Sequence, residues 1–183
     1  MVKIAVMLAD GFEEVEGLTS IDLLRRAGLD VVMVSINDTI EVTGSHKVGF
    51  KADQTIADTN FDEFDMILLP GGMPGTLNLA KEPKLTEAIL KFNAEGKTLA
   101  AICAAPTVFG ALGILEGKRA CCYPGMEDGL KGAIKCTDTV VEDGNIITSR
   151  GVGTAIDFAL CIITKFKGAE AANDLAEGIV YAR

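Results

Sequence analysis

Residues 98–115 read TLAAICAAPTVFGALGIL, an 18-residue run without a charged side chain. That length is the minimum for a membrane span, but Pro106 and two glycines interrupt the run. It divides naturally into a buried strand that ends at Ile102 and a helix over residues 105–112. We therefore expect no membrane span here. The segment instead predicts a strand-to-helix turn at Cys103 in the core of an α/β protein.

The same alternation of strand and helix extends along the whole chain. Buried strands are predicted by apolar runs at residues 2–8, 31–36, 66–69 and 99–102. Helices are predicted over residues 14–27, 85–94, 105–112, 154–166 and 170–180. Hairpins or edge excursions are predicted at residues 42–50 and 140–149. Such alternation forms a mainly parallel sheet covered on both faces, so we predict one three-layer α/β domain over residues 1–183.

The composition excludes several classes of function. Hydrophobic residues make up 49% and charged residues 23%, which is ordinary for a globular chain. The net charge is −9 and no basic run occurs, which argues against a nucleic-acid partner. Five cysteines without a CxxC pair, and a single histidine, argue against a metal site. No signal-peptide pattern is present at the N-terminus, so we expect a reduced, cytoplasmic protein.

Cys103 occupies a position that suits a nucleophile. In α/β proteins, binding and catalytic residues lie at the carboxyl ends of the strands. Cys103 directly follows the strand that ends at Ile102. Its neighbours Ala101 and Ala105 are small, as a crowded nucleophile elbow requires. A helix start favours the thiolate, so we expect the pKa of Cys103 to lie below its usual value of about 8.5. A buried core cysteine remains the alternative.

Two further strand ends supply hydrogen-bond donors and carboxylates. The backbone N–H groups of residues 70–72, PGG, can face the cleft and form an oxyanion hole with the N–H of Ala104, unless the segment is an ordinary turn. Residues 10–16, DGFEEVE, place three glutamates at a helix start, where the helix dipole alone favours them. A glutamate turned inward beside a thiolate would have to hold a proton, because adjacent anions repel.

Four segments together resemble the ThiJ/PfpI superfamily, and within it the Parkinsonism-associated protein deglycase branch, which is glyoxalase III-like. They are ADGFEEVE at residues 9–16, LPGG at 69–72, AAICAAP at 100–106 and TSRGVGT at 148–154. The resemblance spans nearly the whole chain. It implies a flavodoxin-like sandwich with a nucleophile elbow, a homodimer, and chemistry without a cofactor.

The resemblance also assigns roles to individual residues. Cys103 matches the oxidation-sensitive nucleophile, and Glu16 matches the protonated glutamate that hydrogen-bonds it and shuttles protons. Gly72 and Ala104 match the backbone donors to the oxyanion. Arg26 matches an arginine near the site at the dimer interface.

The chain departs from this pattern at two positions. Tyr123 stands where members of the branch place a histidine, and a neutral tyrosine is a poor base at pH 7. His46 stands where close relatives carry an arginine, so it is either a solvated edge residue or a titratable group of the dimer-interface site. Of the neighbours Cys121 and Cys122, we expect one to be buried and one exposed. No histidine follows His46, which argues against a Cys-His protease or an amidotransferase.

The leading hypothesis is an enzyme linked to the response to oxidative stress. Its substrate would be a small aldehyde, either methylglyoxal, glyoxal or an early glycation adduct, and Cys103 would attack the carbonyl. A non-enzymatic redox sensor, in which Cys103 oxidises beside Glu16, uses the same residues. A chaperone of the same family is the third possibility, for which the sequence offers nothing specific.

Overall fold

The computed structural model describes residues 1–182 and is built on a seven-stranded sheet in the order β10-β11-β7-β6-β1-β2-β5. The strands are β1 (Lys3–Leu8), β2 (Asp30–Ser35), β5 (Gln54–Thr55), β6 (Met66–Leu69), β7 (Thr98–Ile102), β10 (Val140–Asp143) and β11 (Ile146–Ser149). Neighbouring strands are parallel throughout, except in the β10–β11 hairpin. The predicted fold class, with its mainly parallel sheet, is confirmed.

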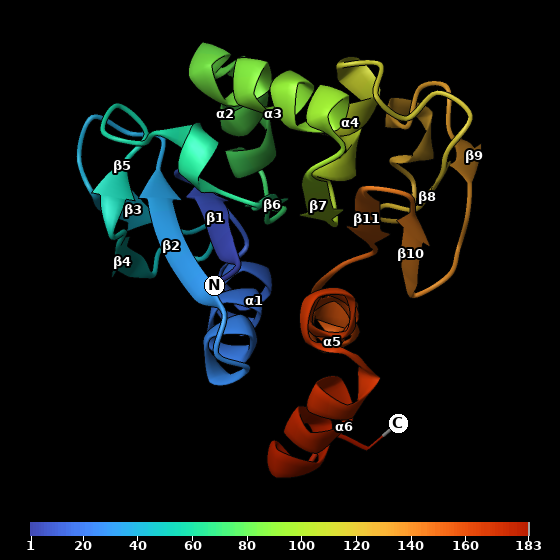
Figure 1. The fold of residues 1–183 in the computed structure, drawn as a ribbon. Helices are drawn as coiled ribbons and strands as arrows, with labels where there is room; N and C mark the ends of the chain where they lie inside the picture. The colour runs from blue at the N-terminus through green and yellow to red at the C-terminus, as the bar shows by residue number, and fades with distance from the viewer. Residues whose placement is uncertain (183) are drawn as a thin grey trace.

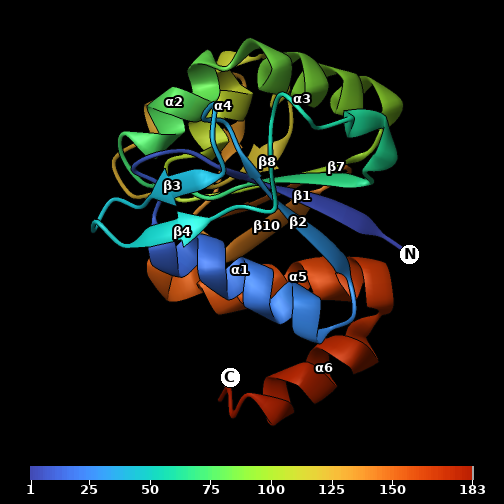
Figure 2. The same cartoon turned by 90° about the vertical axis from the view of Figure 1, so that its left-hand side faces the viewer.

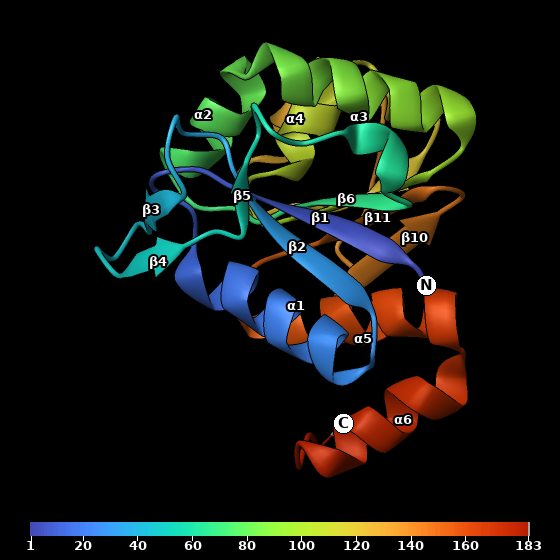
Figure 3. The same cartoon turned by 60° about the vertical axis from the view of Figure 1, so that its left-hand side comes forward.

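Helices cover both faces of this sheet (Figure 1). One layer contains α1 (Glu14–Arg26), α5 (Ala155–Lys167) and α6 (Ala169–Gly178), and the other contains α2 (Gly75–Lys81), α3 (Pro83–Glu95) and α4 (Pro106–Ala111). A separate apolar core lies under each layer. Figure 2 and Figure 3 show α1 and α5 side by side beneath the sheet, with α6 packed farther out. The molecule is therefore the three-layer sandwich that the alternation predicts.

Short elements lie outside the main sheet. They are the antiparallel pair β3 (Glu41–Thr43) and β4 (Gly49–Lys51), the parallel pair β8 (Arg119–Ala120) and β9 (Ile134–Lys135), and the 3-10 turns Phe61–Glu63, Glu127–Gly129 and Val152–Thr154. The hairpin at residues 42–50 is confirmed. The sequence prediction lacked β5, β8, β9 and α2, because two-residue strands and a seven-residue helix after a glycine-rich loop are too short to show a clear periodicity.

The centre of the sheet decides where the site forms. Strands β1, β6 and β7 are neighbours, with Val6 beside Leu68 and Leu69 beside Ala101. Every residue of β6 and β7 is buried, which accounts for the uncharged run at residues 98–115 as core. Among the described residues, no helix has the length and apolar character needed to cross a membrane. Because the three strands run in parallel, the three segments that follow them meet at one edge.

The sequence also predicts that residues 16–27 contribute to a dimer interface, because Leu18, Ile21 and Leu24 form an apolar stripe there. In the structure, most of this stripe packs inside its own chain. Ile21 and Leu24 are buried in the core shared with α5, and only Leu18 reaches the surface. The buried part of the stripe is therefore explained by the fold of the chain itself and gives no support to a dimer interface, which leaves the exposed Leu18 and its neighbour Val15 as the apolar surface of α1.

Candidate active site

Cys103 sits in a strained turn between β7 and α4. Its φ is +63°, in the left-handed region that residues other than glycine seldom adopt. The Cys103 N–H donates to the Ser149 carbonyl at 3.0 Å, and the Cys103 carbonyl accepts from the Tyr123 N–H at 2.8 Å. These bonds hold the strained backbone in place. The thiol is half-buried, and the predicted nucleophile elbow is present.

Glu16 approaches the elbow from the first turn of α1. Its side chain is fully buried, and Oε2 accepts a hydrogen bond from the Gly71 N–H at 2.9 Å. The carboxyl also interacts with the Cys103 thiol. The second oxygen, Oε1, is buried without a hydrogen-bond partner in the described chain. Burying a carboxyl oxygen without a hydrogen bond costs free energy of folding. Such an unsatisfied group is typical of a side chain that acts on a ligand.

The pKa values of Glu16 and Cys103 differ from those expected for a thiol at a helix start. Burial raises the pKa of Glu16 to about 7, although hydrogen bonds from Cys103 and Gly71 oppose the rise. Burial and the charge of Glu16 raise the pKa of Cys103 to about 12, against the backbone N–H groups of Gly72 and Ala104. The expected lowering for Cys103 is therefore wrong. The helix α4 begins three residues later, at Pro106, and the thiol faces a carboxylate instead of a helix start.

The two groups act as one unit in proton transfer. Below about pH 7 Glu16 holds a proton, as an inward glutamate beside sulfur must. Above that pH the ionised Glu16 can take the thiol proton of Cys103, which leaves the total charge of the pair unchanged. Glu16 is thus placed to act as the general base that takes the thiol proton as the sulfur attacks a substrate.

The glycines of the PGG segment allow this close approach. A Cβ on Gly71 would lie 2.5 Å from the Cβ of Cys103 and 2.7 Å from Oε2 of Glu16. Gly72 has φ +91°, and a Cβ there would lie 2.3 Å from the Glu13 nitrogen. The N–H groups of Gly72 and Ala104 both interact with the Cys103 sulfur. An oxygen bonded to the carbon that Cys103 attacks would lie within their reach.

Replacing Gly71 with alanine is expected to disrupt the site by steric overlap. The new methyl group would displace Cys103, because the Cys103 Cβ and the Ile102 carbonyl oxygen, 2.9 Å away, are not flexible side-chain ends. A shift of the Glu16 carboxyl to relieve its own contact would disturb the hydrogen bond from the Gly71 N–H. We expect a loss of about 1–3 kcal/mol in the free energy of unfolding and a fall of about a hundredfold in turnover. Denaturant unfolding and an aldehyde-turnover assay measure the two effects.

Gly153 provides the matched control for Gly71. It lines the same pocket, and a Cβ there would meet no atom within 4 Å. Gly153→Ala should leave both measurements close to those of the natural protein. Equal behaviour of the two variants would mean that the close packing at Gly71 is irrelevant to the site.

A pocket of about 760 Å³ opens over the pair. Its walls include Tyr123, Thr139, Arg150 and residues 151–154. Tyr123 thus lies in the pocket, at the place where the resemblance implies a histidine. Arg150 and Thr139 were not identified from the sequence. Arg150 lies in the segment TSRGVGT at residues 148–154, and this motif is the feature of the sequence that could have identified it.

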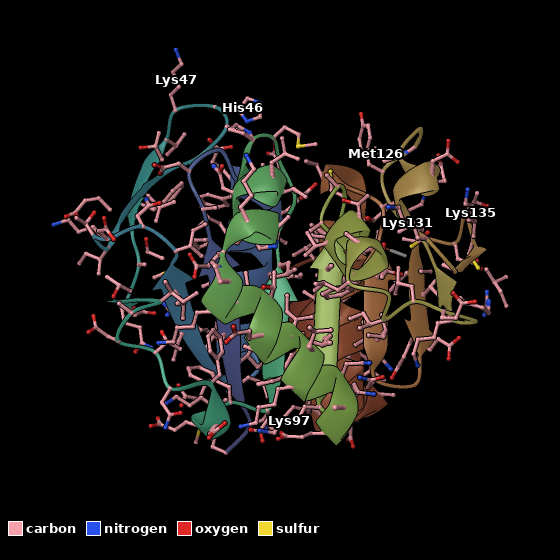
Figure 4. The ribbon with its side chains drawn as sticks, turned by 90° about the horizontal axis from the view of Figure 1, so that it is seen from above. His46, Lys47, Lys97, Met126, Lys131 and Lys135 are labelled. Carbon is pink, nitrogen blue, oxygen red and sulfur yellow. The ribbon has the colours of Figure 1, made fainter. Side chains whose placement is uncertain are left out.

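His46 lies at the rim of the pocket, in the loop between β3 and β4 (Figure 4). Its Nδ1 lies 2.9 Å from Oε2 of Glu14 and 3.5 Å from Oε2 of Glu13. The hydrogen bond to Glu14 and the charges of both glutamates raise the pKa of His46. Burial acts to raise the pKa of Glu14, but hydrogen bonds from His46 and Ser45 outweigh it and lower that pKa to about 2. The two glutamates therefore favour the protonated form of His46.

The same three residues form the one group in residues 1–182 with the donor set of a metal site. The ligand atoms of Glu13, Glu14 and His46 lie within 4.8 Å of one another. In the structure these atoms hydrogen-bond to each other and to Ser45. These hydrogen bonds occupy the candidate ligand atoms, and a site without metal remains our prediction.

The remaining predicted residues lie elsewhere. Arg26 is at the far end of α1, about 15 Å along the helix axis from Glu16, and pairs with Asp22 at 2.6 Å. The structure does not bring Arg26 into the pocket of its own chain. Cys121 and Cys122 are both buried, so the expectation of one exposed thiol is wrong. The reason is that β10, β11 and the core under α4 cover both sides of this segment.

Cys103 is expected to be the thiol that alkylates fastest, because only Cys103 has a buried base beside it. Labelling should increase as the pH rises through about 7, where Glu16 ionises. Cys121 and Cys122 should label last because they are buried. Mass spectrometry after brief exposure to iodoacetamide across a pH series measures the order. Faster labelling of Cys136 or Cys161 in the folded protein would contradict the role of the elbow.

Comparisons with known proteins show which family and which solved structures the chain resembles. The model of the DJ-1/PfpI family matches residues 2–165. "Protein DJ-1 homolog B" of Arabidopsis thaliana is 37% identical over 180 residues, and the chain spans 41% of that protein's length. "Glutathione-independent glyoxalase DJR-1.2" of Caenorhabditis elegans is 34% identical over 93% of this chain and 91% of its own. The solved structure "Toxoplasma gondii DJ-1, oxidized" superposes with a TM-score of 0.96 at 38% identity, over 100% of both chains.

Proposed function

Because the chain belongs to the DJ-1/PfpI family, we propose that it is a cofactor-independent thiol enzyme that converts methylglyoxal or glyoxal to the corresponding hydroxy acid. Early glycation adducts, which carry the same carbonyl chemistry, are the second substrate class, and protection under oxidative stress is the proposed setting. The observation that carries the proposal is the buried pair Cys103–Glu16, with a Glu16 pKa of about 7, beneath an open pocket. A relative named as a glutathione-independent glyoxalase supports it.

The first step forms a carbon–sulfur bond. Glu16 takes the thiol proton, and the Cys103 sulfur attacks the aldehyde carbon of methylglyoxal. The carbonyl oxygen becomes an alkoxide, which accepts hydrogen bonds from the Gly72 and Ala104 N–H groups. Glu16 then returns its proton to that oxygen, and the product is a hemithioacetal.

The second step moves one proton between neighbouring carbons. Glu16 removes the hydrogen from the carbon bonded to sulfur, which gives an enediolate, and delivers a proton to the adjacent carbon. The result is the thioester of lactate on Cys103. Water cleaves this thioester, releases lactate and restores the thiol. The sum is methylglyoxal plus water to lactate plus a proton, without an external oxidant, reductant or base.

The decisive experiment counts product molecules against protein molecules. Purified protein, freed of glutathione and treated with a metal chelator, should form many equivalents of lactate from methylglyoxal. Lactate at the level of a blank, together with conversion of Cys103 to sulfinic acid by peroxide, would favour the second candidate, a redox sensor. That candidate is supported by Glu16, whose protonated form can donate to a sulfinate, and by a similar structure described as oxidised.

We also propose that the protein is a homodimer and resides in the cytoplasm. The free cysteines support a reducing compartment. For the dimer, α1 offers Val15 and Leu18, whose side chains are apolar and exposed in one protomer. Arg26 and His46 would then belong to a site completed by the second copy. Sedimentation at micromolar concentration should give twice the chain mass, and a single-chain mass would contradict the dimer.

A further inference from the structure

Three of the five cysteines lie together at the edge of the molecule, outside the Cys103 site. Cys121 and Cys122 directly follow β8, and Cys136 directly follows β9. In Figure 1 β9 lies at the right-hand edge of the fold, and β8 lies next to β10. The proposed function uses none of the three thiols.

The pairing of β8 with β9 places two of these cysteines side by side. The strands are parallel, with Ala120 opposite Lys135, and the Cys136 N–H donates to the Ala120 carbonyl at 2.8 Å. Both strands end at this pair, and continuing the register by one residue would set Cys121 opposite Cys136. Neighbouring strands are about 4.8 Å apart, and a disulfide spans Cα atoms that are about 4.4–6.8 Å apart. In a register pair both side chains point to the same face.

Cys122 has a different environment. Successive side chains alternate between faces, and Cys122 points into the core under α4, where it packs with the apolar cluster of that layer. Cys121 instead lies against β11, with its sulfur 3.6 Å from the Thr148 hydroxyl. After burial, the charge of Cys136 is among the influences that raise the pKa of Cys121, as expected of two sulfurs that lie near one another.

Two arginines stand next to the Cys121–Cys136 pair. The Arg119 guanidinium donates to Asp138 at 3.2 Å and also interacts with the Cys136 side chain, and the charge of Arg150 favours the ionised form of Cys121 against the effect of burial. Cationic neighbours stabilise thiolates, the form that reacts with peroxides and disulfides. Cys136 is partly exposed, whereas Cys121 is fully buried. An oxidant therefore reaches Cys136 first, and Cys121 is in place to react with the product.

We propose that Cys121 and Cys136 form a second oxidisable site, at which hydrogen peroxide closes an intramolecular disulfide. The Cys136 thiolate attacks one peroxide oxygen, the O–O bond breaks, hydroxide leaves, and a sulfenic acid forms on Cys136. The Cys121 thiolate then attacks that sulfur and displaces the hydroxyl group, which leaves as water. In sum, two thiols and one hydrogen peroxide give one disulfide and two water molecules.

The bond would connect two walls of the active-site pocket. Cys121 lies two residues before Tyr123, whose N–H donates to the Cys103 carbonyl, and Cys136 lies three residues before Thr139. A covalent link between these segments fixes the outer side of the pocket. The modification itself does not involve Cys103, but it joins two chain segments that lead into the walls of the Cys103 pocket.

Peptide mapping of the full chain tests the proposal. After treatment with hydrogen peroxide, blocking of free thiols and trypsin digestion without reductant, residues 120–131 should be joined to residues 136–150. The mass should equal that of the two peptides less two hydrogen atoms, fragmentation should place the bond on Cys121, and a reductant should separate the pair. Cys122→Ser should retain the cross-link and Cys136→Ser should lose it.

Each other outcome would overturn the proposal. These outcomes are a cross-link on Cys122, a bond between two chains, or Cys136 oxidised to sulfinic acid while Cys121 remains a free thiol. The natural chain and Cys122→Ser both carry the complete pair, so the test stands even if Cys136→Ser folds poorly. Lactate formation is not part of the readout, and a failure here leaves the proposed function untouched.

Discussion

Replacing Cys103 with serine is expected to reduce lactate formation from methylglyoxal to the level of a blank, a loss of roughly a thousandfold or more. The serine hydroxyl is a far weaker acid than the thiol, so Glu16, with a pKa of about 7, cannot deprotonate it to a useful extent. The pocket and the Gly72 and Ala104 donors remain, and they have no nucleophile to assist. Product formation followed by lactate dehydrogenase or by NMR measures the loss.

Cys161→Ser is the matched control for this substitution. Cys161 lies on α5, in a different depression of the surface from the active-site pocket, and its sulfur faces Glu142 at 3.9 Å. Its removal should leave lactate formation within a few-fold of the natural protein. If Cys103→Ser kept most of the turnover while Cys161→Ser lost it, the nucleophile would lie elsewhere.

Glu16→Gln is expected to lower aldehyde turnover by about two orders of magnitude or more, within the usual range for general acid–base catalysis. Glutamine keeps the size of the side chain and an oxygen that can accept from the Gly71 N–H, but it cannot carry a proton. In the natural protein, turnover should rise as the pH increases through about 7, because ionised Glu16 is the base. The variant should lack this rise.

The stability of the same variant separates a chemical effect from a structural one. The carboxyl releases its proton near its model value of 4.5 when unfolded, but holds it to about 7 when folded. The unfolded chain therefore binds fewer protons in this window, and stability is lost as the pH rises through it. Glutamine avoids that loss, so the variant should unfold at the same or a higher temperature than the natural protein at pH 8. Asp22→Asn, on the exposed face of α1, should change neither turnover nor its pH dependence.

Unchanged turnover in Glu16→Gln would remove Glu16 from the mechanism. A lower unfolding temperature with partly retained turnover would mean that Glu16 holds the elbow in place and takes no part in proton transfer.

The sequence predicts the fold well because the sheet is buried on both faces. Apolar runs such as residues 66–69 and 98–102 have no other stable arrangement in a chain that alternates strand and helix. The parallel order then brings the strand-end segments together, so the meeting of Glu16, Gly71 and Cys103 follows from the topology. The choice of Glu16 among three neighbouring glutamates required the resemblance, because the helix dipole favours all three equally.

Properties that depend on tertiary contact were not predictable in the same way. The pKa of Cys103 depends on burial and on the distance to Glu16, neither of which a helix-start argument contains. Arg150 and Thr139 reach the pocket through the path of the chain around β10 and β11. The proximity of Cys121 to Cys136 depends on a two-residue strand pairing that leaves no periodic pattern.

The central claim, that Cys103 carries the substrate through a covalent lactyl thioester, is tested most directly by quenching the reaction with acid during turnover. Mass spectrometry of the digested protein should find a lactyl group on the peptide that contains Cys103, and it should disappear once methylglyoxal is exhausted. The account predicts that Glu16→Gln lacks this species, because the proton transfer that forms the thioester is blocked. Lactate that accumulates while Cys103 never carries a lactyl group would contradict the account.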